Sequence, residues 1–218
     1  MTPDAILFDA GGTLVLQHPD RMAAILGFPI DAGAAFEAHY RTIVEFSTLR
    51  ASGEHATWDW FLERYFDRLG HPAPVEAGPV IDRGRGLWTL AIPGTIEVLE
   101  RLNRAGVRMG VVSNSDGSVE ESLREAGLIR FFEIVIDSAV VGSAKPESRI
   151  FLMACERMGL DPAGTWYVGD SRFHDVDGAL GAGFDRSWLV DPLGIQPGPY
   201  SIESVGSLAE RVIGTAAE

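Results

Sequence analysis

Short apolar runs that alternate with helical segments are the feature that most restricts how this chain can fold. The runs are too short for helices and are bounded by turn residues, so they predict buried strands. We expect five of them, at residues 5–8, 107–112, 133–136, 165–168 and 186–190. Segments with helical spacing lie between the last four, at residues 119–126, 150–158 and 175–182. This alternation predicts an α/β fold with a parallel sheet and helices on both faces.

The interval from residue 19 to residue 87 interrupts this alternation, because it contains no strand pattern. Four helical segments are expected there instead, at residues 20–26, 32–47, 57–69 and 75–87. An insertion of roughly 70 residues is too long for a simple crossover between two strands. We therefore expect a core made of residues 1–16 and 88–218, with an α-helical subdomain of residues 17–87 lying over the sheet.

The balance of charge restricts the class of partner. The chain of 218 residues has 18 basic and 31 acidic residues, a formal net charge of −13, and such an anion is repelled by nucleic acids and by acidic membrane surfaces.

The single cysteine, Cys155, permits no intramolecular disulfide and is expected to be buried. No apolar run approaches the roughly 20 residues of a membrane span, and the N-terminus lacks a basic signal region. We expect a cytoplasmic monomer or homodimer that acts on a small molecule.

Four polar clusters follow the predicted strands or the loops after them. They are Asp9-Ala10-Gly11-Gly12-Thr13, Ser113-Asn114-Ser115, Gly142-Ser143-Ala144-Lys145-Pro146 and residues 169–175. In an open parallel sheet, ligands bind beyond the carboxyl ends of the strands, which all lie along one edge. The sequence therefore predicts that these clusters form one site, although each cluster alone is weak evidence.

The acidic residues of these clusters fit a phosphoryl-transfer reaction. Asp9 can attack phosphorus as a carboxylate and form an aspartyl phosphate. Its charge repels an anionic phosphate, so a cation is needed, and Asp170 and Asp175 can hold Mg²⁺ together with Asp9. The alternative for Asp9 is a turn or helix-capping residue, and Asp175 can equally be an N-cap or a loop carboxylate.

Basic and hydroxyl groups complete the predicted site. Lys145 is the only lysine among the 18 basic residues, and a compact ammonium suits the oxygens of a phosphoryl group. A solvated surface lysine is the alternative. Ser113 can donate its hydroxyl to a further oxygen, and N–H groups of the turn at Gly12 can serve the rest. The Ser113-Asn114-Ser115 segment can instead cap the helix expected near Gly117.

Taken together, the motifs resemble those of the haloacid dehalogenase-like hydrolase superfamily. The matching residues are Asp9-x-x-Gly12-Thr13-Leu14, Ser113-Asn114, Lys145-Pro146 and Gly169-Asp170-x-x-x-x-Asp175. The resemblance covers nearly the full chain and implies a Rossmann-like core with a mobile α-helical cap. It also implies Mg²⁺ held by Asp9, the backbone carbonyl of Gly11 and Asp170, with Asp175 in support. Most relatives of this kind are phosphatases, so the expected substrate is a small phosphorylated metabolite, contacted by Ser113, Asn114, Gly12 and Lys145.

Gly11 is a departure from the phosphatase pattern, which places a general acid and base aspartate at that position. Losing such a group typically lowers the rate by about 10² to 10⁴. The deficit is smaller for acyl or aryl phosphates, whose leaving groups need no proton. His18 and His55 are candidate substitutes, although each is also typical of a plain surface histidine.

Gly11 also keeps two other functions open. A 2-haloacid dehalogenase needs an aspartate nucleophile but no metal and no proton donor. A catalytically impaired Mg²⁺ or phosphate-binding protein would have lost the group at this position. A phosphonate-cleaving relative needs a cap lysine, which the composition excludes because Lys145 is the only lysine. A phosphomutase would depend heavily on the missing acid and base.

The helical subdomain offers candidate residues for substrate choice. The turn at residues 50–55 is expected to face the core, which makes Arg50 and His55 candidate substrate-binding residues. Arg50 can equally be a solvated residue at the C-terminus of a helix. The aromatic residues of residues 58–66 are expected to form the subdomain's own core. We expect hinges near residues 16–19 and 87–93.

Overall fold

A six-stranded sheet forms the centre of the molecule. The computed structural model describes residues 3–71 and 86–213 of the 218-residue chain. The strands of the sheet are β1 (Ala5–Phe8), β4 (Arg108–Ser113), β5 (Ile134–Asp137), β6 (Thr165–Gly169), β7 (Arg186–Val190) and β8 (Ser201–Ile202). Their order is β5-β4-β1-β6-β7-β8, and every neighbouring pair is parallel. The sequence prediction of a Rossmann-like parallel sheet is confirmed.

Alternate residues of the strands face two separate layers of apolar side chains, as the pleat of a strand requires. In β1, Ile6 and Phe8 belong to one core cluster, whereas Ala5 and Leu7 belong to the other. The first layer is covered by α5 (Thr95–Arg104), α6 (Val119–Glu125) and α10 (Val205–Ile213). The second layer is covered by α8 (Ser148–Met158) and α9 (Gly178–Gly181). Burial on both faces explains why the strands read as unbroken apolar runs.

Some elements differ from the sequence prediction. The helix expected at residues 175–182 is a π-helical turn, η3 (Arg172–Asp177), followed by α9. The strand expected at residues 133–136 is shifted by one residue and ends at Asp137. The edge strand β8 and helix α10 were not predicted. The remaining short elements are η1 (Ile129–Phe131), η2 (Pro162–Gly164) and α7 (Ser138–Val141).

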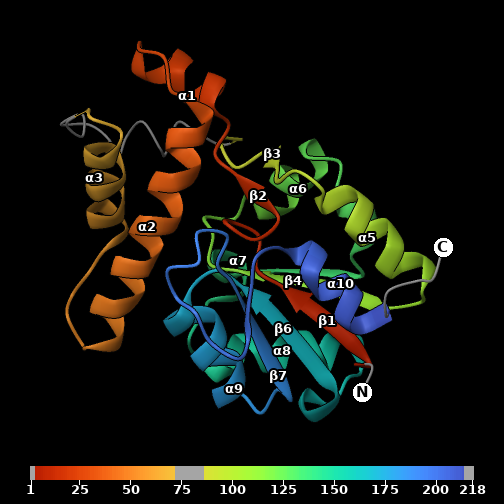
Figure 1. Ribbon diagram of the computed structural model, residues 1–218. Helices are drawn as coiled ribbons and strands as arrows, with labels where there is room; N and C mark the ends of the chain where they lie inside the picture. Colours follow the sequence, from red (N-terminus) through yellow and green to blue (C-terminus); the bar gives the residue numbers. More distant parts are fainter. Residues whose placement is uncertain (1–2, 72–85, 214–218) are drawn as a thin grey trace.

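The helices α1 (Pro19–Leu26), α2 (Ala32–Ala51) and α3 (Trp58–Arg68) form a helical insertion that stands beyond the carboxyl ends of the strands (Figure 1). Two of them begin with a side-chain cap. Asp31 accepts a hydrogen bond from the N–H of Ala34 at 2.8 Å, and Thr57 accepts one from the N–H of Trp60 at 3.3 Å. The fourth predicted helix, at residues 75–87, lies largely outside the described residues.

The two connections between the insertion and the core pair with each other. Strand β2 (Val15–Leu16) runs antiparallel to β3 (Leu90–Ala91). One step further out, the N–H of His18 donates to the carbonyl of Leu87 at 2.7 Å. The segments predicted as hinges therefore overlap a two-stranded ribbon, which the sequence pattern did not reveal.

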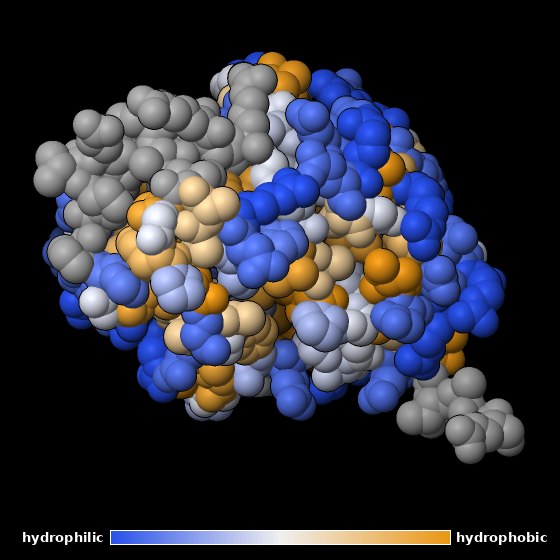
Figure 2. Space-filling model, turned by 90° about the horizontal axis from the view of Figure 1, so that it is seen from above, coloured by the Kyte–Doolittle hydropathy of each residue, from blue (hydrophilic) through white to orange (hydrophobic). Residues whose placement is uncertain are grey.

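The surface over the insertion mixes polar and apolar side chains. Hydrophilic residues dominate one side of the view from above, and apolar residues gather toward the centre (Figure 2).

Among the described helices, none combines the length and apolarity needed to span a bilayer. Cys155 is buried in the second apolar layer, as predicted.

Candidate active site

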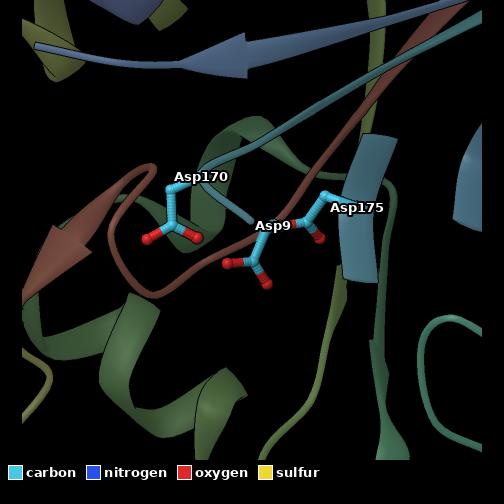
Figure 3. A group of neighbouring side chains, drawn as sticks. All are labelled: Asp9, Asp170 and Asp175. Carbon is cyan, nitrogen blue, oxygen red and sulfur yellow. The ribbon is translucent and has the colours of Figure 1, made fainter. Parts of the chain in front are cut away.

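Three buried carboxylates meet at the carboxyl edge of the sheet. Asp9 follows β1, Asp170 follows β6, and Asp175 lies in η3. One ligand atom from each lies within 4.8 Å of the corresponding atoms of the other two, and the three side chains point toward one another (Figure 3). The strands β1 and β6 are neighbours in the sheet, so their ends bring Asp9 and Asp170 together. The structure therefore brings together the three acidic residues singled out in the sequence.

Lys145 is buried among these acidic groups and is not a solvated surface residue. Its Nζ donates to Oδ1 of Asp9 at 2.6 Å and to Oδ1 of Asp175 at 2.7 Å. A third hydrogen bond, at 3.2 Å, reaches the hydroxyl of Tyr167. The ammonium is thus fully engaged by groups that fix its position, as a buried charge requires.

Asp175 is held by the protein on both of its oxygens. Oδ1 accepts from Lys145, and Oδ2 accepts from the N–H of Ser171 at 2.9 Å. Gly169 leaves room for this carboxylate, because a Cβ at that position would collide with it. These contacts rule out the alternative of a solvated loop carboxylate. They also give Asp175 the geometry of a residue that supports the site through Lys145.

Tyr167 is a site residue that sequence reasoning missed. It lies in the middle of β6, where a tyrosine fits the expected apolar pattern of a buried strand. Its hydroxyl donates to the carbonyl of Val112 at 2.8 Å and accepts from Lys145. Burial, followed by the nearby Asp175, raises the pKa of Tyr167 well above 10, so the hydroxyl keeps its proton.

The glycine-rich turn is shaped by close approaches of neighbouring side chains. Gly12 has a φ of +72°, and a Cβ there would collide with the side chains of Asp170 and His39. Its N–H donates to the carbonyl of Val15 at 2.8 Å, and its carbonyl accepts from the hydroxyl of Tyr40 at 2.7 Å. The backbone of Gly12, a predicted substrate contact, is therefore already engaged by the protein.

Gly11 differs from Gly12 in both respects. Its φ is not in the left-handed region, and among the described residues no group donates a hydrogen bond to its carbonyl. The ring of Trp88 lies against this glycine, so that a Cβ would be 3.0 Å from Cζ3. The carbonyl predicted to bind metal is thus open, and the space of the missing side chain is taken up by an aromatic ring.

Ser113 and Asn114 lie at the end of β4, and they have different surroundings. Ser113 is buried, whereas the amide of Asn114 bonds the main chain of Lys145 in both directions. Its Nδ2 donates to the Lys145 carbonyl at 3.0 Å, and its Oδ1 accepts from the Lys145 N–H at 2.8 Å. The side chain of Asn114 therefore fixes the loop that carries Lys145. Its amide is not free, as a contact with substrate would require.

The capping role considered for Ser113-Asn114-Ser115 belongs to another residue. Asp137, at the end of β5, accepts hydrogen bonds from the N–H groups of Gly117 and Val119 at 3.1 and 3.3 Å. It also accepts from Ala139 at 3.0 Å. One buried carboxylate therefore fixes the loop after β4 and the start of α7.

The pKa values of Asp9 and Asp170 are raised, chiefly by burial and in part by neighbouring carboxylates. Burial raises the pKa of Asp9 to about 7; Lys145 opposes this rise, and Asp175 and Asp170 add to it. Burial also raises the pKa of Asp170, against a lowering by the hydrogen bond with His39. Three carboxylates face one ammonium, so a cation would stabilise their ionised forms. Their oxygen atoms are the ligands that Mg²⁺ prefers.

His39, from the helical insertion, is the most important residue that the sequence did not reveal. Its Nε2 lies 2.8 Å from Oδ2 of Asp170, and the side chain is 2% exposed. A lone histidine in a helix is ordinarily a packing residue. The only signal nearby is that its face of α2 carries small residues, Ala35, Ala38 and Thr42, which let the helix approach the core closely.

The other predicted residues of the insertion contribute less to this geometry. His55 is exposed and His18 is half-buried at the start of α1, and among the described residues neither bonds to a site carboxylate. Arg50 is half-buried near His174, whose pKa burial lowers to about 4 with help from Lys145 and Arg50. The aromatic residues form the insertion's core as predicted, except that Trp58 is 42% exposed.

Known proteins resemble this chain in sequence and in fold. The family model of the haloacid dehalogenase-like hydrolases matches residues 3–183. Glyceraldehyde 3-phosphate phosphatase from Methanothermobacter thermautotrophicus is 39% identical over 184 residues, 83% of this chain and 79% of that protein. A crystal structure of a HAD phosphatase from Thermococcus onnurineus is 26% identical with a TM-score of 0.64, covering 96% of this chain and 97% of that one.

Other relatives match over a smaller part of their length. Haloacid dehalogenase-like hydrolase domain-containing protein 3 from Xenopus laevis is 36% identical over 105 residues, which is 48% of this chain and 42% of that protein. The protein of the same name from Mus musculus is 29% identical over 162 residues, 72% of this chain and 64% of that protein. The chain thus spans less than two thirds of the length of these two relatives.

Proposed function

The chain belongs to the haloacid dehalogenase-like hydrolases, and from that premise we propose that it is a Mg²⁺-dependent phosphatase of a small phosphorylated metabolite. The observation that carries this proposal is the bridge of Lys145 between Asp9 and Asp175, beside Asp170. A buried ammonium that holds one oxygen of a buried carboxylate leaves the other oxygen oriented for attack. Asp9 is the nucleophile in this proposal, and the helical insertion of residues 17–87 is the cap.

Asp9, the carbonyl of Gly11 and Asp170 would hold Mg²⁺, with Asp175 in support through Lys145. When bound, the cation would screen the negative charge of the phosphoryl group from the carboxylates. The fit rests on the open Gly11 carbonyl and on the excess of carboxylates over positive charge at the site. Oδ1 of Asp9 is taken by Lys145, and among the described residues no group donates to Oδ2.

The chain's own residues would then perform two displacements at phosphorus. In the first, an Asp9 oxygen forms a bond to phosphorus while the bond to the leaving oxygen breaks, giving an aspartyl phosphate. In the second, water attacks that phosphorus and the Asp9 carboxylate leaves, releasing phosphate. Lys145 and Ser113 would stabilise the charge that develops on the phosphoryl oxygens.

Gly11 and Trp88 bear on which leaving group is suitable. No side chain at position 11 can protonate a leaving alkoxide, and the ring of Trp88 takes up the space of one. We therefore propose acyl or aryl phosphates as the preferred substrate class, because their leaving groups depart without a proton. The name of the Methanothermobacter thermautotrophicus relative points instead to an alkyl phosphate, glyceraldehyde 3-phosphate.

A substrate panel with Mg²⁺ tests the proposal. Acetyl phosphate, p-nitrophenyl phosphate and glyceraldehyde 3-phosphate would be compared, with phosphate release as the readout. We expect turnover that Asp9→Asn abolishes and EDTA removes, with the first two substrates faster than the third. Asp161→Asn, at the opposite end of β6 from the site, is the control and should retain activity. Faster turnover of the alkyl phosphate would contradict the substrate class and leave the phosphatase reaction intact.

A 2-haloacid dehalogenase is the second candidate, and the absence of a side chain at Gly11 favours it because that reaction needs no proton donor. Chloride release from 2-chloropropanoate in the presence of EDTA would establish it and overturn the phosphatase proposal. Mg²⁺ binding without turnover of either kind would instead indicate an impaired binding protein.

We also propose a cytoplasmic location and a monomer or homodimer, which fractionation and light scattering would test.

A further inference from the structure

The helical insertion reaches one of the proposed metal ligands directly. His39 lies in the middle of α2, 131 positions before Asp170 in the sequence, yet its Nε2 is 2.8 Å from Oδ2 of that residue. Both side chains are almost fully buried, at 2% and 4% exposure. The ionised form of Asp170, which a cation would stabilise, can only accept a hydrogen bond, and His39 then donates through Nε2.

The surroundings fix this histidine in one orientation. Its ring packs edge-on against Trp88 and Phe61, with centroid separations of 5.6 and 5.9 Å. The missing side chain at Gly12 leaves the space in which His39 and Asp170 meet, because a Cβ there would collide with both. Aromatic packing on one side and a bare turn on the other therefore hold the hydrogen bond in place.

We propose that His39 is a positioning residue for the divalent cation, which it serves by fixing the orientation of Asp170. With Oδ2 held by His39, Oδ1 of Asp170 accepts no hydrogen bond from the described residues and is left for a cation. The proposal rests on the Mg²⁺-dependent function proposed above. Partners that orient metal ligands in this way typically change metal affinity by about 10- to 100-fold.

His39 is not assigned as a ligand itself. The group of ligand atoms that lie within 4.8 Å of one another contains Asp9, Asp170 and Asp175, and His39 is not among them in the described residues. The histidine therefore acts on the cation through Asp170.

A consequence is that cation affinity depends on how the insertion packs against the core. Two more contacts join α2 to the core: Tyr40 to the carbonyl of Gly12, and Ser47, whose Oγ accepts from the N–H of Phe173 at 2.8 Å. Because linkage is reciprocal, a bound cation should favour the packed arrangement of the insertion by the same factor.

Calorimetric titration of the full chain with MgCl₂, without substrate, tests the proposal independently of activity. His39→Phe keeps the aromatic packing and removes the donor, so we expect Mg²⁺ affinity to fall by about 10- to 100-fold. His39→Gln retains an N–H at nearly the same reach and should stay within about threefold of wild type. Ser47→Ala is the matched control, because it removes a contact of the same helix that does not involve Asp170. His39→Leu serves as a second donor-free variant if His39→Phe does not fold.

The outcomes separate this proposal from the phosphatase proposal. Unchanged Mg²⁺ affinity in a folded donor-free variant would overturn the role of His39 and leave the phosphatase proposal standing. An equal loss in Ser47→Ala would also overturn it, because the effect would then come from packing of the insertion alone. If wild-type protein binds no Mg²⁺, both proposals fail together.

Discussion

The ring of Trp88 lies directly against Gly11, so that a Cβ on that glycine would be 3.0 Å from Cζ3 of the ring. This contact joins the connection that leaves the insertion to the turn that carries Asp9. The lack of an acid at position 11 therefore involves Trp88 as well as Gly11, because a side chain introduced at position 11 must displace the Trp88 ring.

Restoring the acid should therefore require two substitutions. We expect Gly11→Asp alone to leave the hydrolysis of an alkyl phosphate nearly unchanged, because the carboxylate cannot take its position beside the ring. Gly11→Asp combined with Trp88→Ala should exceed Trp88→Ala alone by about 10² to 10⁴ in kcat. Steady-state kinetics with glyceraldehyde 3-phosphate gives the comparison. A full gain from the single Gly11→Asp variant would show that the ring yields freely.

Removing the buried ammonium of Lys145 should destabilise the folded protein. Lys145→Met leaves Asp9 and Asp175 buried without their cationic partner, and breaking such a pair typically costs about 3–5 kcal/mol of unfolding free energy. Urea titration in EDTA measures this loss of unfolding free energy. Combining Lys145→Met with Asp9→Asn should restore part of it, because one of the unpaired buried charges is then removed. Arg124→Met is the control, because its ion pair with Glu120 is exposed and is expected to change stability by less than about 1 kcal/mol. Equal losses for the two variants would contradict a buried ion-pair network.

The loop after β4 should depend on Asp137. Asp137→Ala leaves the N–H groups of Gly117, Val119 and Ala139 without their acceptor, at a cost of about 1–3 kcal/mol in stability. Because this loop begins at Ser113, we also expect weaker inhibition by inorganic phosphate. Asp161→Ala removes a similar cap at the other end of the sheet and should lower stability without changing the inhibition constant. An unchanged inhibition constant in Asp137→Ala would separate this loop from phosphate binding.

Cys155 should react only when the protein opens. Burial raises the pKa of its thiol to about 11, so very little thiolate is present at pH 8. We expect labelling by 5,5′-dithiobis(2-nitrobenzoic acid) to be slow in native protein and to keep accelerating between pH 8 and pH 10, whereas an ordinary thiol levels off above pH 8.5. Protein unfolded in guanidinium should label at one site with ordinary kinetics. Rapid labelling of the native protein would contradict the burial of this residue.

The core of the site was predictable from sequence for a topological reason. Parallel strands end at a common edge, so Asp9 and Asp170 were expected at the same edge of the sheet, whereas the pairing of β1 with β6 that makes them neighbours was not predicted. Lys145 stood out because it is the only lysine, and its contacts with Asp9 and Asp175 are the clearest agreement between pattern and structure.

His39 and Tyr167 escaped prediction because their roles depend on distance in space. Tyr167 has the ordinary pattern of a strand residue, and only its depth beside Lys145 makes its hydroxyl part of the site. His39 reaches Asp170 only because α2 packs closely on η3, an approach that helical periodicity does not encode. Strand β8 is only two residues long and carries no periodic signal.

The ribbon of β2 and β3 makes the insertion a replaceable module. Because Val15–Leu16 and Leu90–Ala91 pair side by side, the chain leaves and re-enters the core at nearly one point. Sequence between these strands can diverge or change in length without altering the spacing of the main sheet. A transplanted insertion from a relative would keep the nucleophile and lysine intact, but it would have to bring its own partner for Asp170.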